Sequence, residues 1–112
     1  MTSLEALEQA LQDQLSAARH NLHIERVQLH MDTKRFIKAK YVLEYFQTLV
    51  AENGPELALT APAYNVTARE TAIKNNIERL ESIVQTSEES VKQWESAVEN
   101  CKTALASFME KK

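Results

Sequence analysis

The chain has 112 residues, of which 44% are hydrophobic and 26% charged, so we expect one folded domain rather than a disordered segment. A net charge of −3 argues against nucleic-acid binding, and no apolar run approaches the length of a membrane span. The single cysteine, and an acidic N-terminus without the apolar segment of a signal peptide, favour the cytoplasm or the nucleus.

A first helix is predicted over about residues 3–52, because no glycine or proline interrupts this range. A heptad repeat of apolar residues runs through it from about residue 4 to residue 50. The a positions are Leu15, Leu22, Leu29, Phe36, Leu43 and Val50. The d positions are also apolar, except for Glu25 and Asp32. We expect Ser3 to cap the start of the helix and Asn53-Gly54-Pro55 to end it, since glycine and proline favour helix ends.

The predicted linker, residues 53–66, contains both prolines of the chain and the apolar residues Leu57, Leu59 and Tyr64. A simple spacer would carry fewer apolar side chains than this. Two interpretations stay open: the linker packs over the end of the two helices, or it is a short segment that binds a partner.

A second helix is predicted over about residues 67–110, where Thr67 and Glu70 have the spacing of a capping box. Its a positions are Ile77, Val84, Val91, Val98 and Leu105, and its d positions are Ile73, Leu80, Ser87, Trp94, Cys101 and Phe108. A heptad repeat of this length requires lengthwise packing against another helix. We therefore interpret Trp94 and Cys101 as core residues, with a protein-binding hot spot as the alternative for the tryptophan.

Charges beside the two seams favour an antiparallel hairpin. Residues 19–40 carry six Lys or Arg against two acids, and residues 81–99 carry five Glu against one Lys. The expected intrachain ion pairs are Arg26 with Glu95 and Lys40 with Glu81. We predict an all-α fold: one helical domain over residues 1–112, formed by a long antiparallel two-helix coiled-coil hairpin that assembles into a four-helix or larger helical bundle.

The other flank of this hairpin is apolar or small, and two helices alone cannot cover it. Contiguous exposed apolar residues usually mark an interface. The predicted protein interface consists of Ile24, Val27, Met31, Val42, Tyr45, Leu49, Ile83, Ala97 and Ala104.

Two groups of polar residues have alternative interpretations. Glu25 and Asp32 are either solvated at the rim of an imperfect seam or specificity residues that fix register and partner choice. His20, His23 and His30 lie among basic residues, and their spacing does not suit a metal site. We interpret the histidines as part of a solvated face, with a surface for an acidic partner as the alternative.

No phosphate-binding glycine loop and no nucleophile paired with a base is found in the sequence, so we predict no catalytic residue, no cofactor and no metal. The predicted function is that of a non-enzymatic structural or adaptor coiled-coil subunit. Its partner would be itself, as a homodimer, or another helical protein subunit, with no membrane or nucleic acid involved. The alternative is a small helical-hairpin chaperone, or client-binding module.

Overall fold

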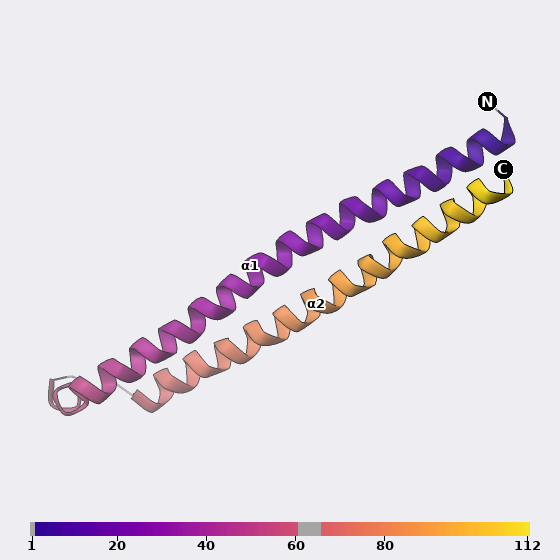
Figure 1. Ribbon diagram of the computed structural model, residues 1–112. Helices are drawn as coiled ribbons and strands as arrows, with labels where there is room; N and C mark the ends of the chain where they lie inside the picture. Colours follow the sequence, from indigo (N-terminus) through magenta and orange to yellow (C-terminus); the bar gives the residue numbers. More distant parts are fainter. Residues whose placement is uncertain (1, 61–65) are drawn as a thin grey trace. The chain divides into compact units, whose positions relative to one another are not determined.

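The computed structural model describes residues 2–60 and 66–112, with the side chains of 2–54 and 66–112. Within these residues the chain forms two long α-helices, α1 (Ser3–Thr60) and α2 (Val66–Lys111). The helices pack against each other as an antiparallel hairpin (Figure 1). The predicted two-helix hairpin is thus confirmed, and its assembly into a larger bundle stays a prediction.

The chain divides by its contacts into two compact units, each of which takes a segment from both helices. Unit 1 comprises Met1–His30 and Thr86–Lys112, and unit 2 comprises Met31–Gln85. Each unit is therefore one antiparallel helix pair with its own seam.

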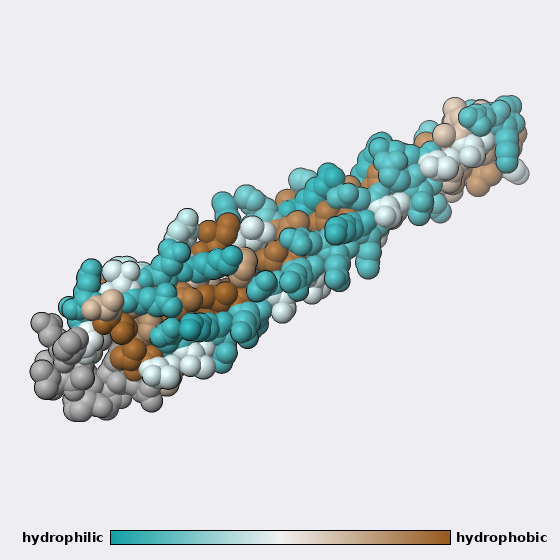
Figure 2. Space-filling view, turned by 60° about the horizontal axis from the view of Figure 1, so that its bottom comes forward, coloured by the Kyte–Doolittle hydropathy of each residue, from teal (hydrophilic) through white to brown (hydrophobic). Residues whose placement is uncertain are grey.

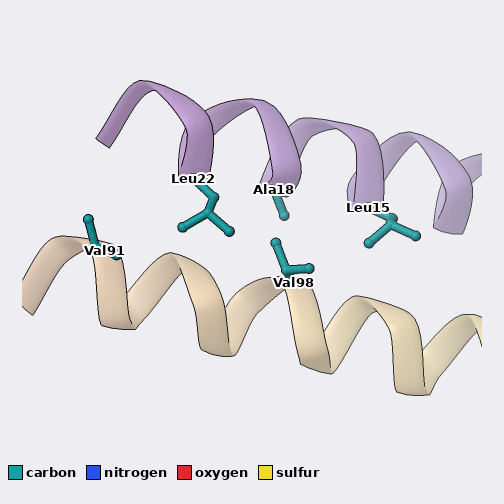
Figure 3. Packing of buried hydrophobic residues seen from close by; sticks show 5 residues of the cluster. All are labelled: Leu15, Ala18, Leu22, Val91 and Val98. Atoms are coloured by element: carbon teal, nitrogen blue, oxygen red, sulfur yellow. The ribbon is translucent and has the colours of Figure 1, made fainter. Parts of the chain in front are cut away.

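Unit 1 contains a compact aliphatic core. Its buried residues are Leu15, Ala18 and Leu22 of α1 and Val91 and Val98 of α2, whose side chains point toward one another across the seam (Figure 3). The partly buried residues packed around them are Leu29, Trp94, Ala97, Cys101 and Leu105. All of these except Ala97 were predicted as a or d residues. Burying a leucine or valine side chain contributes about 1.5–3 kcal/mol, so this cluster is the main stabilising feature of unit 1.

The seam of unit 2 follows the same repeat with fewer buried aliphatic residues. Its buried residues are Ala39, Leu80 and Val84, together with the acid Asp32. The half-buried residues at other a and d positions are Phe36, Leu43, Phe46, Val50, Ile73 and Ile77. The heptad spacing therefore identifies the inner face of both helices in this unit as well.

The start of α1 is capped by Thr2 rather than by Ser3, so that prediction is wrong by one residue. The Glu5 backbone N–H donates to Thr2 Oγ1 at 3.1 Å, and the Thr2 backbone N–H donates to Glu5 Oε2 at 3.3 Å. The Ala6 N–H also donates to the Thr2 carbonyl at 2.9 Å. This reciprocal pair is a capping box, and it requires a carboxylate three residues after the cap, which Thr2 has and Ser3 lacks.

The first seam residues of the predicted repeat do not reach the core. Leu4 is exposed, although it was predicted at a d position. Glu8 already faces the residue that follows α2, because Lys112 Nζ lies 2.9 Å from Glu8 Oε2.

The end of α1 differs from the prediction, because the helix continues through Asn53-Gly54-Pro55 to Thr60 instead of ending near residue 52. Gly54 does not adopt the positive φ with which glycine normally ends a helix. Residues 56–59 (ELAL) are strong helix formers, which favours continuation beyond the proline. The rest of the predicted linker, and the side chains of Leu57, Leu59 and Tyr64, lie outside the described residues.

Neither α1 nor α2, over the residues described, is apolar enough along its length to cross a lipid bilayer.

Candidate protein-interaction surface

In unit 1, α1 presents two members of the predicted interface to solvent. Ile24 and Val27 are exposed, two and five residues after the buried Leu22. Ala104 of α2 is also exposed, whereas Ala97 packs against the aliphatic core. The α1 side chains of this flank therefore point away from the seam, and Ala97 belongs partly to it.

Unit 2 exposes a larger apolar surface on α1. Met31, Val42, Tyr45 and Leu49 are all exposed, as their c and g positions in the heptad predict, and Ile83 of α2 is half-buried. We call these α1 residues of both units, Ile24, Val27, Met31, Val42, Tyr45 and Leu49, the apolar flank. Hydrophobic side chains that reach the surface between hydrophilic ones are visible on the face shown in Figure 2.

Two exposed residues of unit 2 were missed by the sequence analysis. Ile37 and Tyr41 lie at positions b and f, and they were not among the predicted interface residues. Tyr41 is 65% exposed and Tyr45 is 68% exposed, and they are four residues apart on one helix face. That i, i+4 spacing was the signal in the sequence that could have identified the pair.

Asp32 is the least exposed of the buried residues, at 3%, so it is not solvated at the rim of the seam. Arg35 Nη1 lies 3.6 Å from Asp32 Oδ1, which gives the buried carboxylate a cationic neighbour one turn away. Glu25, the other acid at a d position, is half-buried. A charge this well buried normally costs stability unless it is paired, and Arg35 is one of the partners that make Asp32 tolerable.

The two predicted interhelical ion pairs have different outcomes. Arg26 Nη2 lies 3.9 Å from Glu95 Oε1 in unit 1, with both side chains more than half exposed. In unit 2, Lys40 Nζ lies 4.2 Å from the centre of the Phe36 ring, and no ion pair joins it to Glu81, a described residue. The aromatic ring is one turn away on the same helix, so a cation–π contact replaces the expected pair.

Glu70 connects the two helices of unit 2 through its carboxylate. Lys74 Nζ lies 3.0 Å from Glu70 Oε1, and Gln47 Nε2 of α1 donates to the same oxygen at 3.3 Å. The hydrogen bond from Lys74, then that from Gln47 and the charge of Lys74, lower the pKa of Glu70. The Glu70 carboxylate thus binds the side chains of Lys74 and Gln47, and it does not form the capping box predicted with Thr67.

A hollow of about 340 Å³ lies on the charged side of unit 1, and both helices line it. Its lining consists of Arg19, Leu22, Arg26, Glu95, Val98, Glu99 and Lys102. Two of its cations already have partners, because Lys102 Nζ lies 3.3 Å from Glu99 Oε1 and Arg26 pairs with Glu95. The hollow is therefore bordered by charges that largely compensate one another.

The remaining candidates from the sequence lie apart from the apolar surface. His20, His23 and His30 are exposed on α1, and no group of three or more His, Cys, Asp or Glu in the described chain is arranged to hold a metal ion. Trp94 and the free Cys101 are half-buried against the core of unit 1.

No protein-family model, curated protein or solved structure matches this chain. Its function is therefore inferred from the geometry of its exposed side chains.

Proposed function

We propose that the chain is a non-enzymatic structural or adaptor subunit, which assembles with a second copy or with another helical protein through the apolar flank. The observation that carries this proposal is the exposure of the flank in both units, with Met31, Val42, Tyr45 and Leu49 as its largest part. Full burial of such side chains contributes about 1.5–3 kcal/mol each, so covering them would stabilise a complex substantially.

The residue types of the flank support protein binding in particular. Interface hot spots are enriched in tyrosine and arginine, and aliphatic residues around them exclude water. Tyr41 and Tyr45 have the same character, because each combines a large apolar ring with a hydroxyl at its edge. The single thiol, half-buried and unpaired, supports placement in the cytoplasm or nucleus.

The proposal is tested by comparing two double variants of the tagged chain in the cells that express it. Ile24→Glu with Met31→Glu introduces two charges into the apolar flank, one heptad apart. His23→Glu with His30→Glu introduces two glutamates at the exposed neighbouring positions with the same spacing, and serves as the matched control. Circular dichroism of each purified variant verifies that the helices are intact.

The native mass of the captured complex is the measurement. We expect one defined complex for the unmodified chain and for the histidine control, and its loss in the flank variant. A complex of unchanged mass in the flank variant would show that the proposal is wrong. Capture of many proteins without fixed stoichiometry would favour the alternative of a client-binding module instead.

A further inference from the structure

A second heptad spacing runs along α1 in unit 2, on the side away from the seam with α2. Lys38, Val42, Tyr45, Leu49 and Glu52 follow one another at steps of four, three, four and three residues. This is the spacing with which one helix packs lengthwise on another. We call these five residues the outer stripe.

All members of the outer stripe are exposed, so the stripe is not occupied by α2. Its three central residues are apolar, and Tyr41 lies beside them with 65% of its surface exposed. Neither Lys38 nor Glu52 takes part in an ion pair or a side-chain hydrogen bond within the described chain. The stripe is thus an apolar centre with one unpaired charge at each end.

The order of the charges distinguishes between orientations of a bound helix. The lysine lies seven residues before Tyr45 and the glutamate lies seven residues after it. If two copies of the stripe pack antiparallel about Tyr45, each Lys38 faces Glu52 of the second copy, and the two ion pairs are equivalent by symmetry. Parallel packing would instead place lysine against lysine and glutamate against glutamate, which is unfavourable.

Part of the apolar surface matches in the same register, whereas Val42 faces Thr48 of the second copy. Antiparallel packing about Tyr45 places Tyr41 opposite Leu49 of the second copy, on both sides of the axis. The two Tyr45 rings then meet at the centre, where offset aromatic packing is favourable. A stripe whose end charges are complementary to themselves in the antiparallel orientation is what a two-fold interface requires.

We infer that the occupant of the outer stripe is a second copy of this chain, bound antiparallel through α1 about a two-fold axis at Tyr45. The inference rests on the proposed function and specifies its partner. It differs from the general proposal because it names an orientation, a register and two ion pairs, each of which can be tested on the purified chain.

Charge reversal is the first test. Lys38→Glu or Glu52→Lys alone places like charges opposite each other at both symmetric sites, whereas the double variant restores both pairs with the signs exchanged. Lys92→Glu and Glu78→Lys make the same changes at exposed positions of α2 outside the stripe, and are the controls. Light scattering and sedimentation over a dilution series give the dimer dissociation constant of each purified chain.

We expect the unmodified chain to dimerise, and each single reversal to raise the dissociation constant about tenfold or more. The double reversal should restore it to within about threefold, and the controls should leave it unchanged. A dimer that is insensitive to either single reversal, or a double variant as weak as the singles, would overturn the inference.

Disulfide trapping then tests the position of the axis, in a Cys101→Ser background. Oxidation of the Tyr45→Cys variant should link two copies, because the introduced thiols meet at the axis. In the Thr48→Cys variant, the two thiols of an antiparallel dimer are offset by six residues, or about 9 Å along the helix, which is too far for a disulfide. Linkage of the Thr48→Cys chain at the same rate would indicate parallel packing and contradict the inference.

A chain that stays monomeric at all concentrations would also overturn the inference, without deciding the proposed function. The latter is decided by whether the flank variant loses its complex in cells. The two failures are therefore distinguishable.

Discussion

Unit 1 and unit 2 are built from the same two helices and the same heptad repeat, yet they differ in how far their apolar side chains are buried. Unit 1 places Leu15, Leu22 and Val98 in a continuous aliphatic core, and the Arg26–Glu95 ion pair borders it. Unit 2 buries fewer aliphatic side chains, places Asp32 in its seam, and leaves two tyrosines exposed on α1.

The difference shows that one sequence pattern can bury an aliphatic core in one unit and leave apolar side chains exposed in the other. In unit 1 the apolar side chains mostly find their partners within the chain. In unit 2 a second group of apolar side chains stays exposed within the described part of the chain, because a helix pair has only one shared seam. The stability of unit 1 and the binding capacity of unit 2 should therefore respond to different substitutions.

The largest expected effect on the free energy of unfolding comes from truncating one leucine to alanine in each unit. Leu22→Ala should lower the free energy of unfolding by about 2–4 kcal/mol, because it opens a cavity in the core of unit 1. Leu49→Ala, at an exposed position of unit 2, should lower it by less than about 1 kcal/mol at low micromolar concentration. Urea denaturation followed by circular dichroism measures both. Equal losses of stability would contradict the difference between the two units, because they would mean that Leu49 is as well packed as Leu22.

A smaller effect, of opposite sign, is expected at the acids of the seam. Asp32→Leu should raise the free energy of unfolding by about 1–2 kcal/mol, because a buried carboxylate is replaced by an apolar side chain while Arg35 can stay in solvent. Glu25→Leu, at the half-buried d position of unit 1, should give a smaller gain. Thermal and urea unfolding test this. If Asp32→Leu destabilises the chain, the carboxylate contributes net stability through its contacts.

Gly54 offers a test of the helix that continues beyond the predicted stop. Gly54→Ala should stabilise unit 2 by about 0.5–1 kcal/mol, since alanine restricts the unfolded chain more than glycine does. Apart from the adjacent residues and the backbone of the same helix, the added methyl group would meet no atom within 4 Å, and the glycine has no positive φ. The gain is limited by crowding between a Cβ at position 54 and the ring of Pro55. Ala51→Gly, one turn earlier, should cost a similar amount and is the reciprocal control. A loss of stability in Gly54→Ala would indicate that the helix ends at Gly54 in solution.

The smallest effect concerns the polar contact between the helices of unit 2. The pKa of Glu70 is lowered in the folded chain, so its contacts stabilise the fold above the ordinary pKa of a glutamate. That contribution is lost as the pH falls through the lowered, folded-state pKa. An NMR titration of the Glu70 carboxyl carbon should show this shift, and Lys74→Gln should bring the pKa back toward the ordinary range. An unaltered pKa in that variant would assign the shift to another cause.

The inner faces of both helices could be predicted because heptad spacing is a local property of the sequence. Leu22, Val91 and Val98 are buried where the repeat places them. The end of α1 could not be predicted, since the effect of Gly54-Pro55 depends on the helix-forming residues that follow. Two interpretations of Asp32 stayed open, because spacing gives the direction of a side chain but not how closely the second helix approaches it.

The candidate surface was predicted in part, for a related reason. The c and g positions identified Val42, Tyr45 and Leu49 as pointing away from the seam, and each of them is exposed. Tyr41 was not included in the predicted interface, although its spacing of four residues from Tyr45 is visible in the sequence. Which partner covers these residues depends on a second molecule, and a single chain contains no direct record of it.

The contact between Lys112 and Glu8 has a practical consequence for engineering. Because Lys112 Nζ lies 2.9 Å from Glu8 Oε2, the first and last turns of the two helices lie side by side at one end of unit 1. Two polypeptides fused to the two ends of this chain would thus start next to each other. This end of unit 1 could therefore bring together the halves of a split reporter, and the recovered signal would follow the integrity of the contact between Lys112 and Glu8.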